Sequence, residues 1–265
     1  GGGSGGSSGG GGGIAPTPRN FKVSPTELNV VLSIGGEGTY EIEIENLEKR
    51  NLTFNLEVSG ISQYLFLGET KVTVPSNGKL KIPLAVSAPE SGIYAGRIIV
   101  SSGITEKEVF VILNVRSSDA LFDVSLTLSN AYKTLGLGQN LKTFISLLQV
   151  GEAEQVDVTA TYLIKNFEGV VLFTETETFS VYKSKSFVKE FPTLNLPAGD
   201  YIAGLDVQYP DGFATSSARF SIIERKINIW VVAFVLLAVF AVIAIFFAIE
   251  KYRKMSKQFS SKGKK

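Results

Sequence analysis

Residues 38–46 read GTYEIEIEN, a stretch that alternates apolar or aromatic side chains with acidic ones. Tyr40, Ile42 and Ile44 share one side, and the glutamates at 41, 43 and 45 share the other. Successive side chains of a β-strand point to opposite faces, so a period of two is typical of a half-buried strand. The stretch therefore predicts a strand with one face on a core and an acidic face in solvent.

The same kind of pattern recurs along most of the chain. Further strands are predicted at 52–58, 71–75, 78–86, 94–102 and 107–115, and then at 123–129, 142–150, 156–165, 169–181, 186–195, 199–210 and 214–224. Turn residues such as Ser76-Asn77-Gly78 and Pro210-Asp211-Gly212 separate the runs. Many short strands with no helical period between them indicate an all-β chain built of antiparallel sandwiches.

The β-rich region is long enough for two domains. It covers 211 residues from Ile14 to Glu224, and single domains of about 100 residues are common. A polar break with no apolar run, Arg116-Ser117-Ser118-Asp119, falls near its middle. We therefore expect one sandwich at 14–118 and a second at 119–224.

An uncharged run at 227–249 predicts a membrane anchor. A helix of that length spans roughly 34 Å, enough to cross a hydrocarbon core of about 30 Å. We assign a transmembrane helix to 225–250 and a basic cytoplasmic tail to 251–265. Trp230 at one end, and Lys251, Arg253 and Lys254 at the other, are expected at the membrane interfaces. The region before the span is then displayed outside the cytoplasm.

Within the predicted span, three small residues fall on one helical face. Ala241, Ala244 and Ala248 are spaced so that another helix could approach closely there. Alanine is also ordinary on lipid-facing helices, and this alternative stays open.

The chain opens with a segment that cannot form a core. Residues 1–13 contain only glycine and serine, a composition typical of a flexible tether or leader. An exported N-terminus needs a targeting signal, and we expect that a signal peptide has been removed. The segment is then either the start of the mature chain or an introduced spacer.

Composition excludes several function classes. Outside the basic tail, 19 bases stand against 24 acids, which argues against nucleic acid as a partner. The chain has no cysteine and no histidine, so thiolate or imidazole metal sites and Ser-His or Cys-His catalysis are excluded. A displayed protein of this size without disulfides favours a prokaryotic source. We expect no cofactor.

The order of features in the first half resembles a known family. Ser24-Pro25 leads a strand, Glu45-Asn46 closes the alternating one, and Gly92-Ile93-Tyr94-Ala95-Gly96 opens a late one. This order is similar to the immunoglobulin-like modules found in tandem on archaeal and bacterial membrane-anchored surface proteins, of the cell-adhesion-related type. The resemblance covers roughly residues 21–116. In the second half, Leu196 to Tyr201 looks like the start of a similar closing hairpin. The family implies adhesion, spacing or docking, and no set of active residues.

Five glutamates near the first strand form the densest acidic cluster. They are Glu37, Glu41, Glu43, Glu45 and Glu48. One strand cannot supply the six to eight oxygens that calcium takes. A glycosidase would need two carboxylates facing each other across a cleft, and nothing in the pattern creates one; Asp200 and Asp211 are explained by turns. We favour a solvated face paired with Lys79 and Lys81 on a neighbouring strand.

Asn51-Leu52-Thr53 is the only Asn-x-Ser/Thr sequon, which makes Asn51 a candidate glycosylation site on the displayed side. Taken together, the sequence predicts a non-enzymatic single-pass surface protein that acts as an interaction or assembly subunit. Its expected partners are membrane lipid and another envelope or membrane protein. A passive spacer or adhesion stalk is the alternative, and a carboxylate glycosidase is a remote one. A binding role predicts an exposed apolar patch, whereas a spacer predicts uniformly polar faces.

Overall fold

The computed structural model describes residues 17–150 and 154–224, together with the single residues Leu237 and Ile245. In residues 17–150 and 154–224 the chain forms strands joined by turns, with one short 3₁₀ helix, η1 (Asn130–Tyr132). The prediction of an all-β chain is confirmed for this part. The strands of both halves belong to one compact unit that ends at Ile223.

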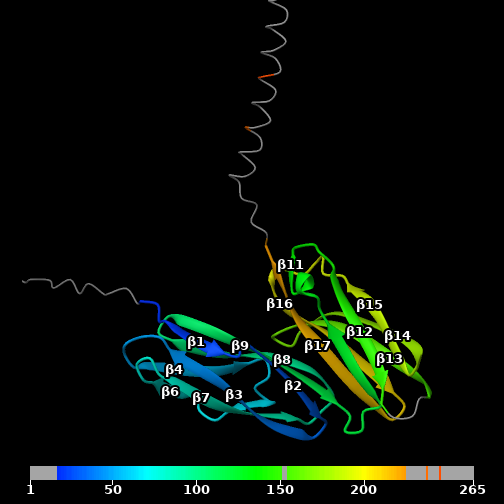
Figure 1. Cartoon of the computed structure of the whole chain (residues 1–265), viewed down its shortest axis with the longest axis horizontal. Coiled ribbons are helices and arrows are strands. Elements are labelled where there is room, and N and C mark those ends of the chain that lie inside the picture. The colour runs from blue at the N-terminus through cyan, green and yellow to red at the C-terminus, as the bar shows by residue number, and fades with distance from the viewer. Residues whose placement is uncertain (1–16, 151–153, 225–236, 238–244, 246–265) are drawn as a thin grey trace, which may run out of the picture. The chain divides into compact units, whose positions relative to one another are not determined.

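The first half builds two sheets (Figure 1). One has the order β1 (Phe21–Ser24), β3 (Gly36–Asn46), β7 (Lys79–Ala88) and β5 (Leu65–Leu67). The other has the order β2 (Glu27–Ser33), β9 (Thr105–Arg116), β8 (Gly92–Ser102), β4 (Leu52–Ser59) and β6 (Lys71–Val74).

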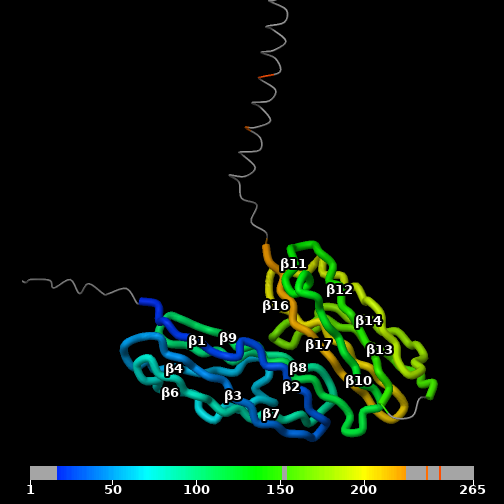
Figure 2. The backbone as a smooth tube through the Cα atoms, in the orientation of Figure 1, coloured from blue at the N-terminus to red at the C-terminus, as the bar shows by residue number. Residues whose placement is uncertain are grey.

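The second half repeats this plan. One sheet has the order β10 (Phe122–Thr127), β12 (Leu141–Gln149) and β15 (Ser184–Phe191). The other has the order β11 (Thr134–Gly136), β17 (Gly212–Ile223), β16 (Gly199–Tyr209), β13 (Gln155–Asn166) and β14 (Val171–Tyr182). If β5 is set aside, the strand order of each sheet in the first half matches that of its counterpart here. Figure 2 traces both halves, blue to green and then green to orange.

The expectation of purely antiparallel pairing is wrong at one edge of each larger sheet. There, β2 pairs in parallel with β9, and β11 pairs in parallel with β17. In both halves the preceding strand belongs to the opposite sheet, because β1 pairs with β3 and β10 pairs with β12. The chain therefore changes from one sheet to the other near the start of each sandwich. The strand after this change, β2 or β11, pairs in parallel with the final strand of the same sandwich, β9 or β17.

Each sandwich has its own apolar core. Ile42, Ile44 and Phe54 are fully buried in the first, as the alternating pattern predicts, and Tyr162 and Phe220 are fully buried in the second. Full burial of side chains of this size contributes roughly 1.5–3 kcal/mol each. The two cores hold the sheets of each half together, and so fix the positions of the surface residues described below.

Among the described residues, no helix is long and apolar enough to cross a membrane. The predicted transmembrane segment 225–250 and basic tail 251–265 lie outside the described residues, apart from Leu237 and Ile245. The predicted Gly/Ser segment 1–13 also lies outside them.

Candidate functional site: the outer faces and the joint between the sandwiches

The glutamates of β3 lie beside lysines of β7, as the sequence predicted. Register places Glu43 opposite Lys81 and Glu45 opposite Lys79. The Lys79 Nζ is 2.9 Å from Glu43 and 3.7 Å from Glu45, and Lys81 pairs with Glu41. The hydrogen bond with Glu43 raises the pKa of Lys79, and the one with Glu41 raises that of Lys81. This face carries a group of exposed ion pairs, and exposed ion pairs contribute little to the stability of the fold.

The calcium hypothesis gains nothing from this arrangement. Among the described residues, no group of three or more acidic side chains is placed to hold a metal ion. Asp200 is also not a turn residue: it lies on β16, where it accepts hydrogen bonds from Arg219 (2.9 Å) and Ser221 (2.6 Å). An ion pair, rather than turn chemistry, explains this acid.

Asn51 lies exposed just before β4. Its Oδ1 accepts a hydrogen bond from the backbone N–H of Ser76 at 3.2 Å. Thr53, two residues on, shares a hydrogen bond with Thr73 at 3.1 Å between the two hydroxyl oxygens. The hydrogen bond from Ser76 uses the Oδ1 atom of Asn51. The Nδ2 atom, which would carry an N-linked sugar, belongs to the same exposed side chain.

The outward side of β10, β12 and β15, named here the β12 face, has exposed apolar side chains in place of the ion pairs of the first sandwich. Phe144 and Val188 are opposite each other in the β12–β15 register and are 52% and 61% exposed. Leu148, on the same side of β12, is 53% exposed. Between the Phe144–Val188 pair and Leu148, Ser146 and Ser186 share a hydrogen bond. The centre of this face thus carries apolar and hydroxyl groups without charge.

Among the described residues, the charges of the β12 face lie at its two ends. Asp123 is opposite Leu148 at one end, and at the other Lys142 is paired with Glu190 at 2.6 Å. The hydrogen bond with Glu190 raises the pKa of Lys142. The sequence analysis did not single out this face, although the exposed positions of Phe144, Leu148 and Val188 follow from the strand alternation.

The outer edge strands of the second sandwich carry inward-facing charges that the sequence analysis also missed. Lys189 on β15 is only 15% exposed; its Nζ is 2.6 Å from Glu175 on β14 and 4.2 Å from the ring centroid of Tyr162. The Tyr162 hydroxyl donates to Glu177, and burial, followed by that bond, raises the pKa of Tyr162. Inward charges on edge strands oppose pairing with another chain.

The two sandwiches meet at a joint with its own apolar cluster. Ile93, Ala95, Phe110 and Ile112 project from β8 and β9 and pack with Phe167, in the turn between β13 and β14, and with Ile202 of β16. Phe110 and Phe167 pack edge to face, with ring centroids 4.7 Å apart. This cluster explains why contacts group both sandwiches into one compact unit.

Polar contacts surround the apolar cluster. Arg97 of β8 lies 2.6 Å from Glu168 in the β13–β14 turn. Arg219 of β17 contacts Asp200 at 2.9 Å and Glu27 of β2 at 3.4 Å. The Thr215 hydroxyl donates to the buried Val115 carbonyl at 2.8 Å. The joint therefore combines apolar burial with directional contacts that fix its geometry.

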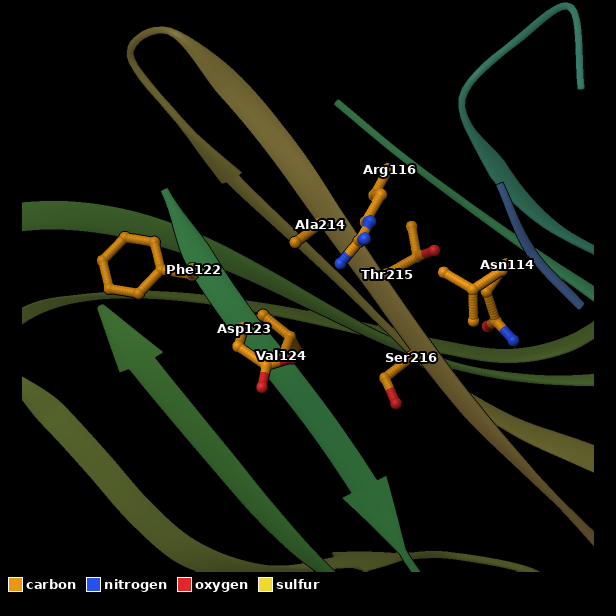
Figure 3. Close-up of a pocket in the computed structure, with 9 residues that line it drawn as sticks. Asn114, Arg116, Phe122, Asp123, Val124, Ala214, Thr215 and Ser216 are labelled. Atoms are coloured by element: carbon orange, nitrogen blue, oxygen red, sulfur yellow. The ribbon is translucent and has the colours of Figure 1, made fainter. Parts of the chain in front are cut away.

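A small pocket opens beside the joint, where β9, β10 and β17 come together (Figure 3). Its volume is about 150 Å³, and its lining includes Asn114, Arg116, Asp123 and Thr215. Figure 3 shows the Arg116 side chain directed toward Ala214 and Thr215. Ligand pockets usually measure about 300–1,000 Å³, so this one is small for an organic substrate.

The remaining predicted site residues lie outside the described residues. These are Trp230, Lys251, Arg253 and Lys254 at the membrane interfaces, and Ala241, Ala244 and Ala248 on the helix-packing face.

No known family model matches the sequence, and no curated protein is significantly similar to it. Solved structures are similar in fold only. The chain is 12% identical to a protein of unknown function from Porphyromonas gingivalis W83, with 76% of this chain and 99% of that one covered and a TM-score of 0.37. It is 14% identical to a chain of a chaperone–tip adhesin complex of CFA/I fimbriae biogenesis, with 78% of this chain and 100% of that one covered and a TM-score of 0.32.

A third similar structure is PapD-like domain 7 of human CEP192, at 14% identity and a TM-score of 0.32. It covers 40% of this chain and 94% of that domain. All three TM-scores lie below 0.5, and these likenesses carry no argument about function.

Proposed function

We propose that this protein is a non-enzymatic, single-pass cell-surface protein that acts as an interaction or assembly subunit of an envelope or membrane complex. In this proposal residues 225–250 anchor the chain and the immunoglobulin-like sandwiches stand outside the cytoplasm. The uncharged run 227–249 and the basic tail after it support the anchor and its orientation.

The observation that carries the interaction role is the β12 face. Binding predicts exposed apolar side chains, and Phe144 with Val188, together with Leu148 beyond the serine pair, are exposed on a single sheet face. Because about half of each side chain is exposed, their burial in an interface would contribute roughly 1 kcal/mol each. The partner surface that fits is apolar and uncharged at its centre.

The first sandwich offers a contrast on the corresponding sheet. There, one end of the outward side of β3 and β7 carries paired charges, with Lys79 and Lys81 against Glu43 and Glu41. Desolvating such charges is costly, which disfavours tight packing against an apolar partner. The second sandwich, next to the predicted membrane anchor, is therefore the proposed contact region.

The absence of enzyme activity is part of the proposal. The pocket at the joint is about half the usual minimum volume for a ligand site. The glutamates of β3 are held by lysines on an exposed face, whereas a glycosidase needs one of two facing carboxylates to be kept protonated by burial. Both observations support a binding protein.

A photoreactive amino acid at the centre of the β12 face tests the proposal. At position 186 it should crosslink to one envelope or membrane protein when the chain is expressed in its own cells. At position 39, on the outward side of β3 in the first sandwich, it should give no such product. Crosslinking at position 39 alone would overturn the assignment of the face.

The packed joint favours a spacer as the second candidate function. A cluster that includes Phe110, Phe167 and Ile202 holds the sandwiches together, as a stalk of fixed length requires. A spacer needs no partner on the β12 face, so the absence of any crosslink at positions 186 and 39 would favour it.

A further inference from the structure

Asp206 stands in the row of β16 residues that faces the first sandwich. The same row contains Ile202, which joins the apolar cluster, and Gly204, where an added Cβ would lie 2.7 Å from Ile93. Register pairs Asp206 with Thr215, whose hydroxyl donates to Val115 across the joint. Asp206 therefore lies at the docking surface of the second sandwich.

The Asp206 carboxylate is poorly matched to this position. Its Oδ1 is buried and has no hydrogen-bond partner among the described residues. The cation on the neighbouring strand, Lys165, instead donates from Nζ to the Ile93 carbonyl of the first sandwich at 3.0 Å. Burial raises the pKa of Asp206, which Lys165 only partly offsets, and burial lowers the pKa of Lys165.

Two further cations at the joint are in ion pairs, and Arg116 of β9 and Asp123 of β10 line the pocket beside it. Arg219 of β17 contacts Asp200 of β16 and Glu27 of β2. Arg97 of β8 contacts Glu108 of β9 and Glu168 of the β13–β14 turn. Asp206 is thus a carboxylate at the joint whose buried Oδ1 has no hydrogen-bond partner within the part of the chain that the structure describes.

We propose that the joint is a pH-responsive latch in which protonation of Asp206 strengthens the docking of the two sandwiches. An undocked Asp206 is exposed to water and titrates near the ordinary aspartate value of about 3.9. The docked carboxyl binds its proton at higher pH, so within the window between the two values the docked state holds a proton that the undocked state lacks. Docking therefore strengthens as the pH falls through that window.

Lys165 adds a second, weaker dependence at the alkaline side. Because its docked pKa is lowered, docking also strengthens as the pH rises through that lowered value toward the ordinary value of about 10.4. The latch is consequently loosest between the two windows and tightens on acidification through the first.

Two spin labels on the full-length protein test this directly, because the chain contains no cysteine. Lys71→Cys on β6 and Ser184→Cys on β15 place one label at an exposed position of each sandwich. The distribution of distances between the labels should narrow when the pH falls from about 7.5 to about 4, close to the ordinary aspartate value. In Asp206→Asn, whose side chain is neutral throughout, the distribution should be narrow at both pH values.

Asp211→Asn is the matched control, because it removes an aspartate from the exposed β16–β17 turn; it should respond to pH like the parent. A melting curve gives an independent readout: Asp206→Asn should raise the melting temperature more at a pH of about 7.5 than at a pH of about 4. A parent distribution that does not change with pH, or a pH response that persists in Asp206→Asn, would overturn the proposal.

Discussion

The guanidinium carbon of Arg219, on β17, lies 3.6 Å from the ring centroid of Phe110, on β9 of the other sandwich. The same guanidinium pairs with Asp200 beside it and with Glu27 across the joint. One side chain thus combines a cation–π contact with ion pairs to both sandwiches. This contact ties the repeated sandwiches into one unit.

Replacing Arg219 with alanine should destabilise the protein by about 2 kcal/mol. The change removes the contact with Phe110 and leaves the part-buried Asp200 without its cation. Urea unfolding followed by circular dichroism measures the loss. Arg50→Ala removes an exposed ion pair with Glu48 and should cost less than about 1 kcal/mol. Equal losses in the two variants would contradict the role given to Arg219.

Gly204→Ala should weaken the joint through steric overlap. The added Cβ would lie 2.7 Å from Cδ1 of Ile93 and 2.7 Å from Cδ1 of Leu163, so a buried side chain has to move. We expect a loss of about 1–2 kcal/mol in the free energy of unfolding. Gly199→Ala, on the same strand, meets no atom nearer than 3.5 Å and serves as the control. A neutral Gly204→Ala would mean that the sandwiches can separate slightly without cost.

Most strands were predictable because their alternation is strong. The run at 38–46 became β3, with Ile42 and Ile44 buried as the pattern requires. The pairing of its glutamates with Lys79 and Lys81 was also confirmed, because both runs alternate and a hairpin-like register brings them together. Local pattern was sufficient for these strands, whereas β1, with Phe21 and Val23 on the core, was not among the predicted ones.

Short strands and the joint were not predictable by the same reasoning. β5 and β11 have three residues each, which is too few for a period to appear. The parallel pairing of β2 with β9 depends on a change of sheet that no local pattern records. The cluster around Phe110 and Phe167 joins residues far apart in sequence, and its apolar side chains resemble ordinary core positions of β9.

Lys189→Met should make the second sandwich prone to self-association. Lys189 places a charge inside the sandwich at the edge strand β15, where it pairs with Glu175. Methionine fills a similar volume without that charge, and an uncharged edge accepts a strand from another chain more readily. Size-exclusion chromatography over a concentration series should show larger species. Lys133→Met, which changes an exposed lysine outside the strands, should elute like the parent protein. If Lys189→Met also elutes like the parent, Lys189 does not protect the edge strand from self-association.

Asn51 should carry an N-linked glycan when the protein is isolated from its native envelope. The side chain is exposed, and its Oδ1 is held by Ser76. Intact-mass measurement should therefore exceed the mass of the polypeptide, and Asn51→Gln should remove the excess. Asn77→Gln, at a nearby exposed asparagine outside the sequon, should keep it. A native chain of unmodified mass would rule out this site.

Purification of the intact protein from its own membranes in mild detergent tests the central claim most directly. We expect one stoichiometric partner, which is lost from the double variant Phe144→Ser/Val188→Thr. Phe66→Ser, which removes an equally exposed phenylalanine from the first sandwich, should keep it. Removing the two apolar side chains should weaken the complex at least about tenfold. A partner that stays bound to both variants equally, or a parent protein that purifies alone, would contradict the assignment of the β12 face as the interaction surface.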